Sequence, residues 1–287
     1  MLVTVYLITQ NRSQLLERAI KSVIQQDYKE IELIVVDDAS NDNTPETIAA
    51  LQKDYDFIYL RNDVVRGACF SRNRAIQKAT GYFITGLDDD DYFLPERVRQ
   101  LVDAYEEQYA FVCSNVKELM KNGTMIPRSY GFQSGEFGLN EMLHHNLAGN
   151  QVFTTKKKFE QIGGFDVEMP AFQDYDTWVR LLKNNPKALK IAATNYILET
   201  EHGGVRISSS VNRKFQGFEK FKYKHRDLLK PSHLKSLTIL EAKVSGSGFG
   251  FIDLIKSISP RNYKSALSLY IQRNMSWLKT RVDNLKG

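Results

Sequence analysis

The first 116 residues alternate between short apolar runs rich in β-branched side chains and segments with the apolar spacing of an amphipathic helix. Strands are predicted at 2–8, 31–36, 57–60, 82–87 and 110–116, and helices at 15–24, 44–53, 68–79 and 95–109. This alternation predicts an α/β fold with a mostly parallel central sheet covered by helices on both faces. In such a sheet the ligand lies outside the carboxyl ends of the strands. The residues that follow the strands are therefore the candidate functional residues.

Three of the predicted strands are followed directly by a polar cluster. The clusters are Thr9-Gln10-Asn11-Arg12, Asp37-Asp38-Ala39-Ser40 and Asp88-Asp89-Asp90-Asp91. Because neighbouring parallel strands end at the same edge of a sheet, the three clusters are expected to converge there. The second cluster alone is also ordinary turn and capping chemistry, so it indicates a site only together with the others.

The four consecutive aspartates, Asp88–Asp91, are the strongest chemical signal. Like charges at this spacing oppose one another's ionisation unless a positive group joins them. The alternative is a solvated acidic turn, but the run follows an apolar strand directly, which fixes its first members at the sheet edge. Carboxylate ligands select a hard cation such as Mg²⁺ or Mn²⁺ and leave coordination positions open for phosphate oxygens. A metal that binds together with a diphosphate is therefore expected.

The formal charge is distributed unevenly along the chain. Residues 1–202 carry 22 basic and 29 acidic side chains, a net of −7, whereas residues 203–287 carry 17 and 5, a net of +12. This asymmetry predicts an acidic working domain and a basic, helical extension that meets an anionic membrane, nucleic acid or an acidic partner. No nucleic-acid-binding motif accompanies the charge, so nucleic acid is not expected as a partner.

Cysteine usage and hydropathy bear on the compartment of the protein. Cys69 and Cys113 do not make a disulfide framework or a Cys-x-x-Cys pair, which favours a reducing cytoplasm. The apolar run 2–8 lacks the basic and small-residue flanks of a signal peptide. No stretch approaches the roughly 18 apolar residues of a spanning helix, so any membrane association is expected to be peripheral.

Five groups of residues, in this order and spacing, resemble glycosyltransferase family 2. They are Thr9–Arg12, Val35–Thr44, Ser71-Arg72-Asn73, Leu87–Asp91 with Pro95, and Gly163-Gly164-Phe165-Asp166 with Asp174. The resemblance covers about residues 1–205 and leaves the C-terminal extension outside it. It implies the GT-A fold, a nucleotide-sugar donor and inversion at the anomeric carbon.

The resemblance also implies roles in the first half of the chain. Asp88–Asp90 align with the family's Asp-x-Asp motif, which places Asp88 on the ribose, Asp90 on the metal and Asp89 at the variable middle position. Asp38, with Asp37 behind it, corresponds to the acid that contacts uracil. The residues that fall where the family cradles the nucleotide and its diphosphate are Thr9, Asn11, Arg12 and Arg72. The implied donor is a UDP-sugar, and the implied cofactor is Mn²⁺ or Mg²⁺.

An inverting transfer needs a carboxylate that takes the proton from the acceptor hydroxyl. In the family this base is the Asp of a Glu-Asp pair at the start of a helix, and Asp174 matches it, with Gln173 in place of the usual Glu. The alternative for Asp174 is a helix cap. Gln173 and Trp178 are expected on the acceptor side. His202 resembles a third metal ligand, with a hinge contact to the diphosphate as the alternative.

The segment 206–287 interleaves cations with aromatic and aliphatic side chains. This composition suits a helix that lies in a membrane interface, and the alternative is that its apolar residues pack on the catalytic domain. The expected domains are a GT-A catalytic domain at 1–205, divided into a nucleotide-binding half (1–116) and an acceptor-binding half (117–205), and the basic extension. The expected location is the cytoplasmic face of the inner membrane.

Together these features predict an inverting hexosyltransferase. It would move glucose or galactose from a UDP-sugar to a hydroxyl of a polyprenyl-diphosphate-linked saccharide, through a β linkage such as β-1,3, in the assembly of O-antigen or another surface polysaccharide. Alternatives are a protein or soluble glycan acceptor, and a non-catalytic nucleotide-sugar scaffold, which Gln173 favours. A receiver domain is disfavoured because its acidic pair follows the first strand, and a Rossmann dehydrogenase because no Gly-x-Gly-x-x-Gly opens a helix.

Overall fold

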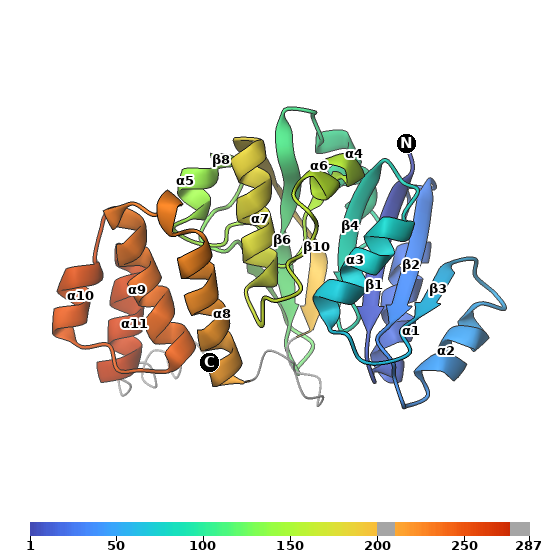
Figure 1. Ribbon diagram of the computed structural model, residues 1–287, viewed down its shortest axis with the longest axis horizontal. Coiled ribbons are helices and arrows are strands. Elements are labelled where there is room, and N and C mark those ends of the chain that lie inside the picture. Colours follow the sequence, from blue (N-terminus) through green and yellow to red (C-terminus); the bar gives the residue numbers. More distant parts are fainter. Residues whose placement is uncertain (200–209, 276–287) are drawn as a thin grey trace. The chain divides into compact units, whose positions relative to one another are not determined.

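The computed structural model of the protein describes residues 1–199 and 210–275 (Figure 1). These residues form two compact units. Unit 1 contains 1–139, 147–167 and 173–199, and unit 2 contains 140–146, 168–172 and 210–275. Two short segments of the expected catalytic domain therefore belong to unit 2. The expected domain limit at 205 lies outside the described residues and stays a prediction.

One half of the sheet in unit 1 is parallel, as the sequence predicts. In it β1 (Val3–Thr9) lies between β2 (Ile31–Asp37) and β4 (Phe83–Asp88), and β3 (Ile58–Arg61) pairs with β2. Most side chains of β1, β2 and β4 are buried, which explains their almost unbroken apolar sequence. The register sets Thr9 beside Asp37 and Ile8 beside Asp88. The three polar clusters therefore start at one edge of the sheet.

The other half of the sheet is mixed. Beyond β4 the order continues through β9 (Phe153–Thr155), β6 (Tyr109–Leu119), β10 (Lys187–Glu199) and β5 (Tyr92–Phe93), while β7 (Met125–Arg128) pairs with β6 and β8 (Gly135–Gly138) with β10. β6 and β10 run parallel to each other, and the four short strands pair antiparallel to their neighbours. The sequence does not predict β7, β8 or β9, because segments of three or four residues are too short to show a period.

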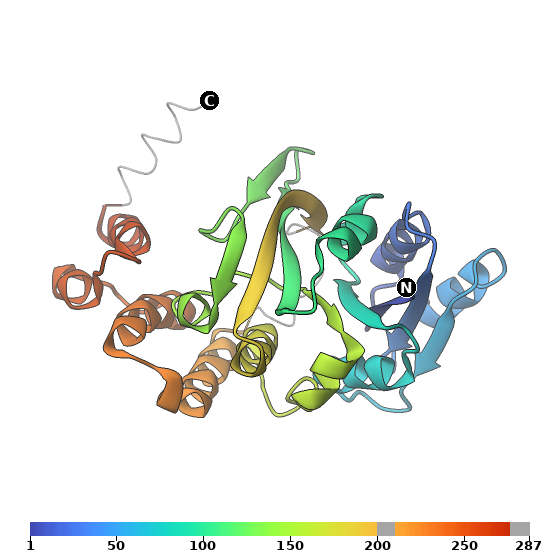
Figure 2. The same ribbon diagram turned by 90° about the horizontal axis from the view of Figure 1, so that it is seen from above.

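Helices cover both faces of this sheet. They are α1 (Ser13–Ile24), α2 (Thr44–Leu51), α3 (Ala68–Lys78), α4 (Arg97–Ala104), α6 (Lys156–Gln161) and α7 (Gln173–Asn184). Figure 2 shows α1 and α4 on one face of the sheet and α3, α6 and α7 on the other. The apolar stripe of α1 faces the core, as its sequence spacing predicts. Its residues Leu16, Ala19, Ile20 and Val23 are buried, and Leu15 and Ile24 are partly buried. This layering leaves the loops at the carboxyl edge of the strands to form a site.

The prediction of one helix over 95–109 is wrong at both ends. The helix α4 begins at Arg97, whose buried guanidinium donates to Ser114 Oγ and Asn195 Oδ1, both at 2.7 Å. These bonds anchor the first turn to the sheet. The helix ends at Ala104, because Tyr105 is extended, and Tyr109 already belongs to β6. Tertiary contacts therefore override the helical spacing.

Unit 2 is helical, as expected for the C-terminal region. It contains α8 (Val211–Lys224), the short 3-10 helix η2 (Arg226–Leu228), α9 (Pro231–Ser245), α10 (Phe251–Ser257) and α11 (Tyr263–Asn274), and most of α5 (Leu139–Met142). The helices α9, α10 and α11 enclose a small core of Ile239, Ala242, Phe249, Leu254, Ala266 and Leu269. Across 1–199 and 210–275, no helix is both long and apolar enough to cross a membrane.

Candidate active site

The first two polar clusters are locked together at the carboxyl edge. Asn11 and Ala39 both have left-handed backbones, with φ of 55° and 58°, which turns their loops sharply after β1 and β2. The Asn11 amide donates to Ser40 Oγ at 2.9 Å, and Asn11 Oδ1 accepts from the Asn41 amide at 2.7 Å. Thr9 ends β1 with 1% of its surface exposed, and its carbonyl accepts from the Asp38 amide at 2.9 Å. Thr9 and Asn11 thus join the loop after β1 to the loop after β2 at the carboxyl ends of these strands.

Asp37 and Asp38 are both buried and organise the neighbouring loops. Asp37 accepts from the Ser40 amide at 2.8 Å and from the Tyr59 hydroxyl at 3.1 Å. Asp38 accepts from Asn62 Nδ2 at 2.6 Å and from the backbone amides of Arg66 and Gly67 at 2.9 and 2.7 Å. Asp38 therefore fixes the loop that leads into α3. Its predicted contact with uracil stays a prediction.

Asp88, at the end of β4, is oriented by two amide side chains that the sequence does not single out. Asn150 Nδ2 donates to Asp88 Oδ2, and Gln151 Nε2 donates to Asp88 Oδ1, both at 3.0 Å. Gln151 Oε1 in turn accepts from the buried Tyr6 hydroxyl at 3.3 Å. Gly86 makes room for this arrangement, because a Cβ at this position would lie 2.1 Å from Gln151 Oε1.

The aspartates that follow have unequal surroundings. Asp89 and Asp90 both accept from Arg12 Nη1, at 2.8 and 2.9 Å. Burial raises the pKa of Asp89 to about 6, although Arg12 opposes the shift. Burial, reinforced by the charges of Asp88 and Asp90, raises the pKa of Asp91 well above its usual value. Asp91 accepts from the Tyr196 hydroxyl at 2.8 Å and from the Glu199 amide at 3.1 Å, so it secures the loop to β10.

Arg72 joins the two carboxylates that the sequence assigns to the donor and to catalysis. Its Nη2 donates to Asp88 Oδ1 at 3.0 Å, and its Nη1 donates to Asp174 Oδ1 at 3.3 Å. The Arg72 side chain is 10% exposed, whereas those of Asp88 and Asp174 are 28% and 26% exposed. Burial raises the pKa of Asp174 to about 6, and Arg72 acts in the opposite direction. A carboxylate with this pKa can accept a proton near neutral pH.

The segment 163–166 is held to α3 by Asn73, the residue after Arg72. Asn73 Oδ1 accepts from the Phe165 amide, and Asn73 Nδ2 donates to the Phe165 carbonyl, both at 2.8 Å. Gly164 has φ of 74°, and a Cβ there would lie 2.6 Å from Asn73 Oδ1, so glycine is required. The Arg72 guanidinium lies 5.2 Å from the centre of the Phe165 ring. Two motifs about 90 residues apart in sequence thus form one support for Arg72.

The start of α7 places Gln173 and Asp174 together, but it corrects the expectation for Trp178. The Trp178 side chain is fully buried, with its ring centre 6.1 Å from that of Phe111 and 6.0 Å from that of Phe165. Its indole N–H donates to the Gly149 carbonyl at 3.0 Å. Trp178 has no surface to offer an acceptor and instead fixes α7 to the core. His202 lies outside the described residues.

We call the surface formed by Arg12, Arg72, Asp88, Asp90 and Asp174 the carboxylate edge. Asp88 and Asp90 offer oxygen ligands at its partly open positions, with 28% and 14% of their side chains exposed. Among residues 1–199 and 210–275, no group of three His, Cys, Asp or Glu side chains is arranged to hold a metal ion. One or two carboxylates completed by phosphate oxygens fit Mg²⁺ or Mn²⁺. The carboxylate edge therefore fits a cation that arrives with a diphosphate.

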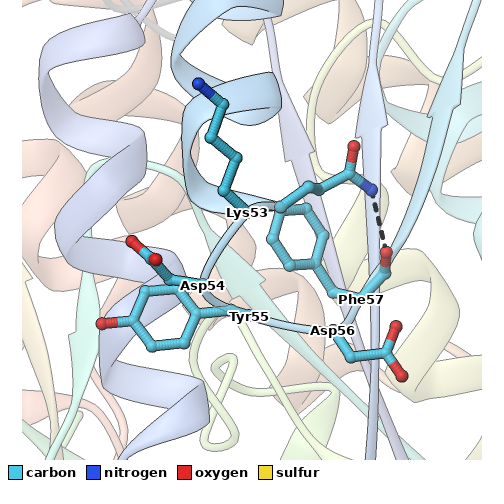
Figure 3. Close-up of a pocket in the computed structure, with 6 residues that line it drawn as sticks. Lys53, Asp54, Tyr55, Asp56 and Phe57 are labelled. Atoms are coloured by element: carbon cyan, nitrogen blue, oxygen red, sulfur yellow. Dashed lines mark hydrogen bonds between the residues drawn. The ribbon is translucent and has the colours of Figure 1, made fainter.

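A pocket elsewhere on unit 1 is a poor candidate for the active site (Figure 3). Residues 52–57, between α2 and β3, line it, and Gln52 Nε2 donates to the Phe57 carbonyl across it at 3.1 Å. These residues precede β3, so the pocket lies at the amino ends of the parallel strands, away from Asp37 and Asp88. Its charged side chains, Lys53, Asp54 and Asp56, are exposed. It has none of the partly buried carboxylates of the carboxylate edge.

Comparisons with known proteins agree with this geometry. The chain is 34% identical over 272 residues to the putative colanic acid biosynthesis glycosyl transferase WcaA of Escherichia coli K12, covering 92% of this chain and 95% of that protein. It is 33% identical over 180 residues to the GalNAc(5)-diNAcBac-PP-undecaprenol beta-1,3-glucosyltransferase of Campylobacter jejuni, covering 61% and 58%.

Among solved structures, S. aureus TarS residues 1–349 in complex with UDP-GlcNAc matches with a TM-score of 0.71 at 18% identity, covering 94% of this chain and 79% of that one. This likeness supports the expected GT-A fold. The model of the family described as Glycosyl transferase family 2 matches residues 4–167. More than half of the chain fits that model, and the chain therefore belongs to glycosyltransferase family 2.

Proposed function

We propose that the protein transfers a hexose, glucose or galactose, from a UDP-sugar to a hydroxyl of a polyprenyl-diphosphate-linked saccharide, with inversion to a β linkage. One observation carries the catalytic part of this proposal. A single guanidinium, that of Arg72, bridges Asp88 and Asp174, so the carboxylate assigned to the donor and the carboxylate assigned to proton transfer lie close together.

The reaction follows from these assignments. The Asp174 carboxylate takes the proton from the acceptor hydroxyl as that oxygen bonds to the anomeric carbon. The bond from this carbon to the diphosphate oxygen breaks on the opposite face, and UDP leaves with the electron pair. Arg12 and Arg72 supply positive charge beside the leaving diphosphate. When bound at Asp90, Mg²⁺ or Mn²⁺ would offset further negative charge on that group.

The acceptor assignment rests on a relative and on composition. The Campylobacter relative is named for glucosyl transfer to an undecaprenol-diphosphate-linked saccharide. The basic and apolar C-terminal region of the present chain suits a peripheral encounter with a membrane that carries such an acceptor. A role in the assembly of O-antigen or another surface polysaccharide follows from that chemistry. A soluble glycan or protein acceptor is the alternative, as is a scaffold that binds the donor without turnover.

The first experiment screens UDP-sugars and other nucleotide sugars for thermal stabilisation of the full chain in the presence of Mn²⁺. The best donor is then incubated with a polyprenyl-diphosphate-linked saccharide and, in parallel, with a soluble glycan. We expect transfer only to the lipid-linked saccharide. Transfer to the soluble glycan alone contradicts the acceptor assignment, and donor binding without transfer to any acceptor supports the scaffold.

Asp174→Asn tests the base. Because the amide retains size and hydrogen bonding but takes up no proton, kcat should fall by about 10²–10⁴-fold, with UDP affinity within a few-fold of wild type. Asp56→Asn, at an exposed aspartate away from the carboxylate edge, is the matched control and should keep most of the activity. Loss of UDP binding by Asp174→Asn reassigns Asp174 to the donor.

A further inference from the structure

Unit 2 carries a set of exposed apolar side chains that its own core does not use. Six large apolar residues between 251 and 267 are each at least 40% exposed: Phe251, Ile252, Ile255, Ile258, Tyr263 and Leu267. We call this set the outer apolar face. Isolated exposed apolar residues are ordinary, but a continuous group marks a surface that meets another apolar phase. The face needs an explanation beyond folding.

The helix α10 shows the imbalance most clearly. It directs Leu254 and Ser257 inward, with 9% and 1% of their surfaces exposed, and it leaves Phe251, Ile252 and Ile255 at 62%, 66% and 57%. Successive residues of a helix are about 100° apart, so these three apolar residues share one side within an arc of about 100°. The helix therefore presents more apolar side chains outward than inward.

The start of α11 extends this surface. Tyr263 and Leu267 lie one turn apart on α11 and are 48% and 47% exposed, whereas Ala266 and Leu269 face the core. The rings of Phe251 and Tyr270 are in edge contact, with centres 6.3 Å apart, so the two helices meet at this surface. The outer apolar face is thus one surface built from two neighbouring helices.

Cations border the face, and its one acid is engaged in capping. Lys256 follows Ile255, Lys264 follows Tyr263, and Lys235 Nζ on α9 reaches the Ile258 carbonyl at 3.5 Å. Within 246–275 the sequence has four basic residues and a single acid, Asp253. Asp253 Oδ2 accepts from the Gly250 amide at 2.9 Å and so caps α10. Apolar side chains with flanking lysines match the acyl boundary and the anionic headgroups of a bilayer.

We propose that the outer apolar face binds the surface of an anionic lipid bilayer, with Phe251, Ile252 and Ile255 inserted at the headgroup–acyl boundary and Lys256 and Lys264 on the headgroups. A second copy of the chain fits less well, because a two-fold interface brings the same lysines toward each other. The inference deepens the proposed function by assigning the membrane contact to named residues. Its test, however, needs no transfer activity.

The test measures flotation of the full chain with vesicles. Wild type should bind vesicles of phosphatidylcholine with phosphatidylglycerol, bind phosphatidylcholine alone more weakly, and lose affinity as salt rises. The double variant Ile252→Ser/Ile255→Ser should bind mixed vesicles at least about tenfold more weakly, because it removes inserted apolar surface. The matched control, Val64→Ser/Val65→Ser, changes side chains of unit 1 that are 60% and 59% exposed, and should bind as wild type.

Lys256→Gln/Lys264→Gln gives a second, independent variant, because it leaves the apolar core of unit 2 unchanged. It should weaken binding to mixed vesicles while binding to phosphatidylcholine alone stays the same. Equal vesicle binding by wild type and both variants overturns the inference. The inference is also overturned if wild type is a dimer and Ile252→Ser/Ile255→Ser converts it to a monomer without loss of lipid binding. That result would assign the outer apolar face to contact with a second copy of the chain.

The outcome is separable from that for the proposed function. A chain that floats with anionic vesicles but transfers no sugar keeps the lipid surface and loses the transferase proposal. A chain that transfers sugar to the lipid-linked saccharide in detergent, and does not float with vesicles, keeps the transferase proposal and loses the lipid surface. The Ile252→Ser/Ile255→Ser variant should retain the thermal stabilisation of wild type by the donor, because it leaves the carboxylate edge unchanged.

Discussion

The carboxylate edge of unit 1 and the outer apolar face of unit 2 differ in how their functional groups are held. At the edge, Asp88 accepts three hydrogen bonds from surrounding side chains, and Arg72 is 10% exposed. At the outer apolar face, Phe251, Ile252 and Ile255 are more than half exposed. Preorganised polar groups stabilise a defined transition state, whereas exposed apolar groups suit a fluid partner without fixed geometry. Variants that disturb the preorganised groups of the carboxylate edge test this contrast.

Removal of a proposed metal ligand should lower the transfer rate most, because the carboxylates of the carboxylate edge are where a cation would bind. Asp90→Asn, or addition of EDTA to wild type, should lower transfer by at least about 100-fold, since a bound cation contributes several kcal/mol to a developing diphosphate charge. Mn²⁺ or Mg²⁺ should restore the EDTA-treated wild type but not the variant. Titration calorimetry of UDP with and without Mn²⁺ should show the same loss of metal-dependent affinity. Undiminished metal-dependent affinity of Asp90→Asn for UDP would mean that Asp90 does not bind the metal. Asp63→Asn, which changes an exposed aspartate, serves as the control.

Gly86→Ala should have the next largest effect, because it disturbs the side chains that hold Asp88 in place. The added Cβ would lie 2.1 Å from Gln151 Oε1 and 2.5 Å from the Tyr6 ring, so the support of Asp88 must shift. Overpacking of this kind lowers the free energy of unfolding by about 1–3 kcal/mol, and donor affinity should fall as well. Thermal unfolding and UDP binding measure the two effects. Gly248→Ala, where nothing lies within 4 Å of the added Cβ, should change neither.

The acidic limb of the pH–rate profile tests whether Arg72 lowers the pKa of Asp174. The pKa of Asp174 in the unliganded protein is raised to about 6, and a base acts only when deprotonated, so kcat/KM should fall about tenfold per pH unit below 6. Arg72 stabilises the Asp174 carboxylate and lowers this pKa. In Arg72→Gln the limb should therefore move to higher pH, beyond any fall in the plateau rate. An unmoved limb means that the titrating group is not Asp174.

Sequence reasoning identified the parts of the edge that strand ends and helix starts define, such as Asp88 and Asp174. It did not identify Asn150 and Gln151, because they precede a three-residue strand, β9, that has no detectable period. The bridge from Arg72 to Asp174 spans 102 residues, and the sequence gives no direct signal for that contact. Trp178 was misassigned because the sequence shows an aromatic at a motif position but does not show which side of α7 faces the core.

The outer apolar face was anticipated only as a composition. The sequence shows apolar residues and lysines interleaved after 206, a pattern that equally fits packing and lipid contact. The structure separates core residues from exposed residues within single helices, since Leu254 and Leu269 enter the core while Ile255 and Leu267 do not. Tertiary packing decides which side of a helix faces the core. The apolar spacing within the seven residues of α10 is too short to predict that side.

The smallest expected effect is on the pH dependence of stability, and it concerns the polar interior of unit 2. The side chains there are held by fixed contacts, as at the carboxylate edge, but they have no proposed role in catalysis. The rings of His144 and His233 are in contact, with centres 4.5 Å apart, and His144 Nδ1 lies 2.9 Å from Ser236 Oγ. Burial, together with the charges of His233 and Arg261, lowers the pKa of His144 to about 4.

An unfolded chain binds a proton at this imidazole near pH 6.5, but the folded chain does not until about pH 4, so acid favours unfolding. Urea unfolding should show full stability above pH 6.5 and a loss of about 1 kcal/mol by pH 5, after allowance for solvent screening at a partly exposed group. Burial also lowers the pKa of His233, so His144→Gln should reduce this dependence without abolishing it, whereas His145→Gln, the exposed neighbour, should keep it. An equal slope in wild type and His144→Gln would assign the acid sensitivity of unit 2 to another group.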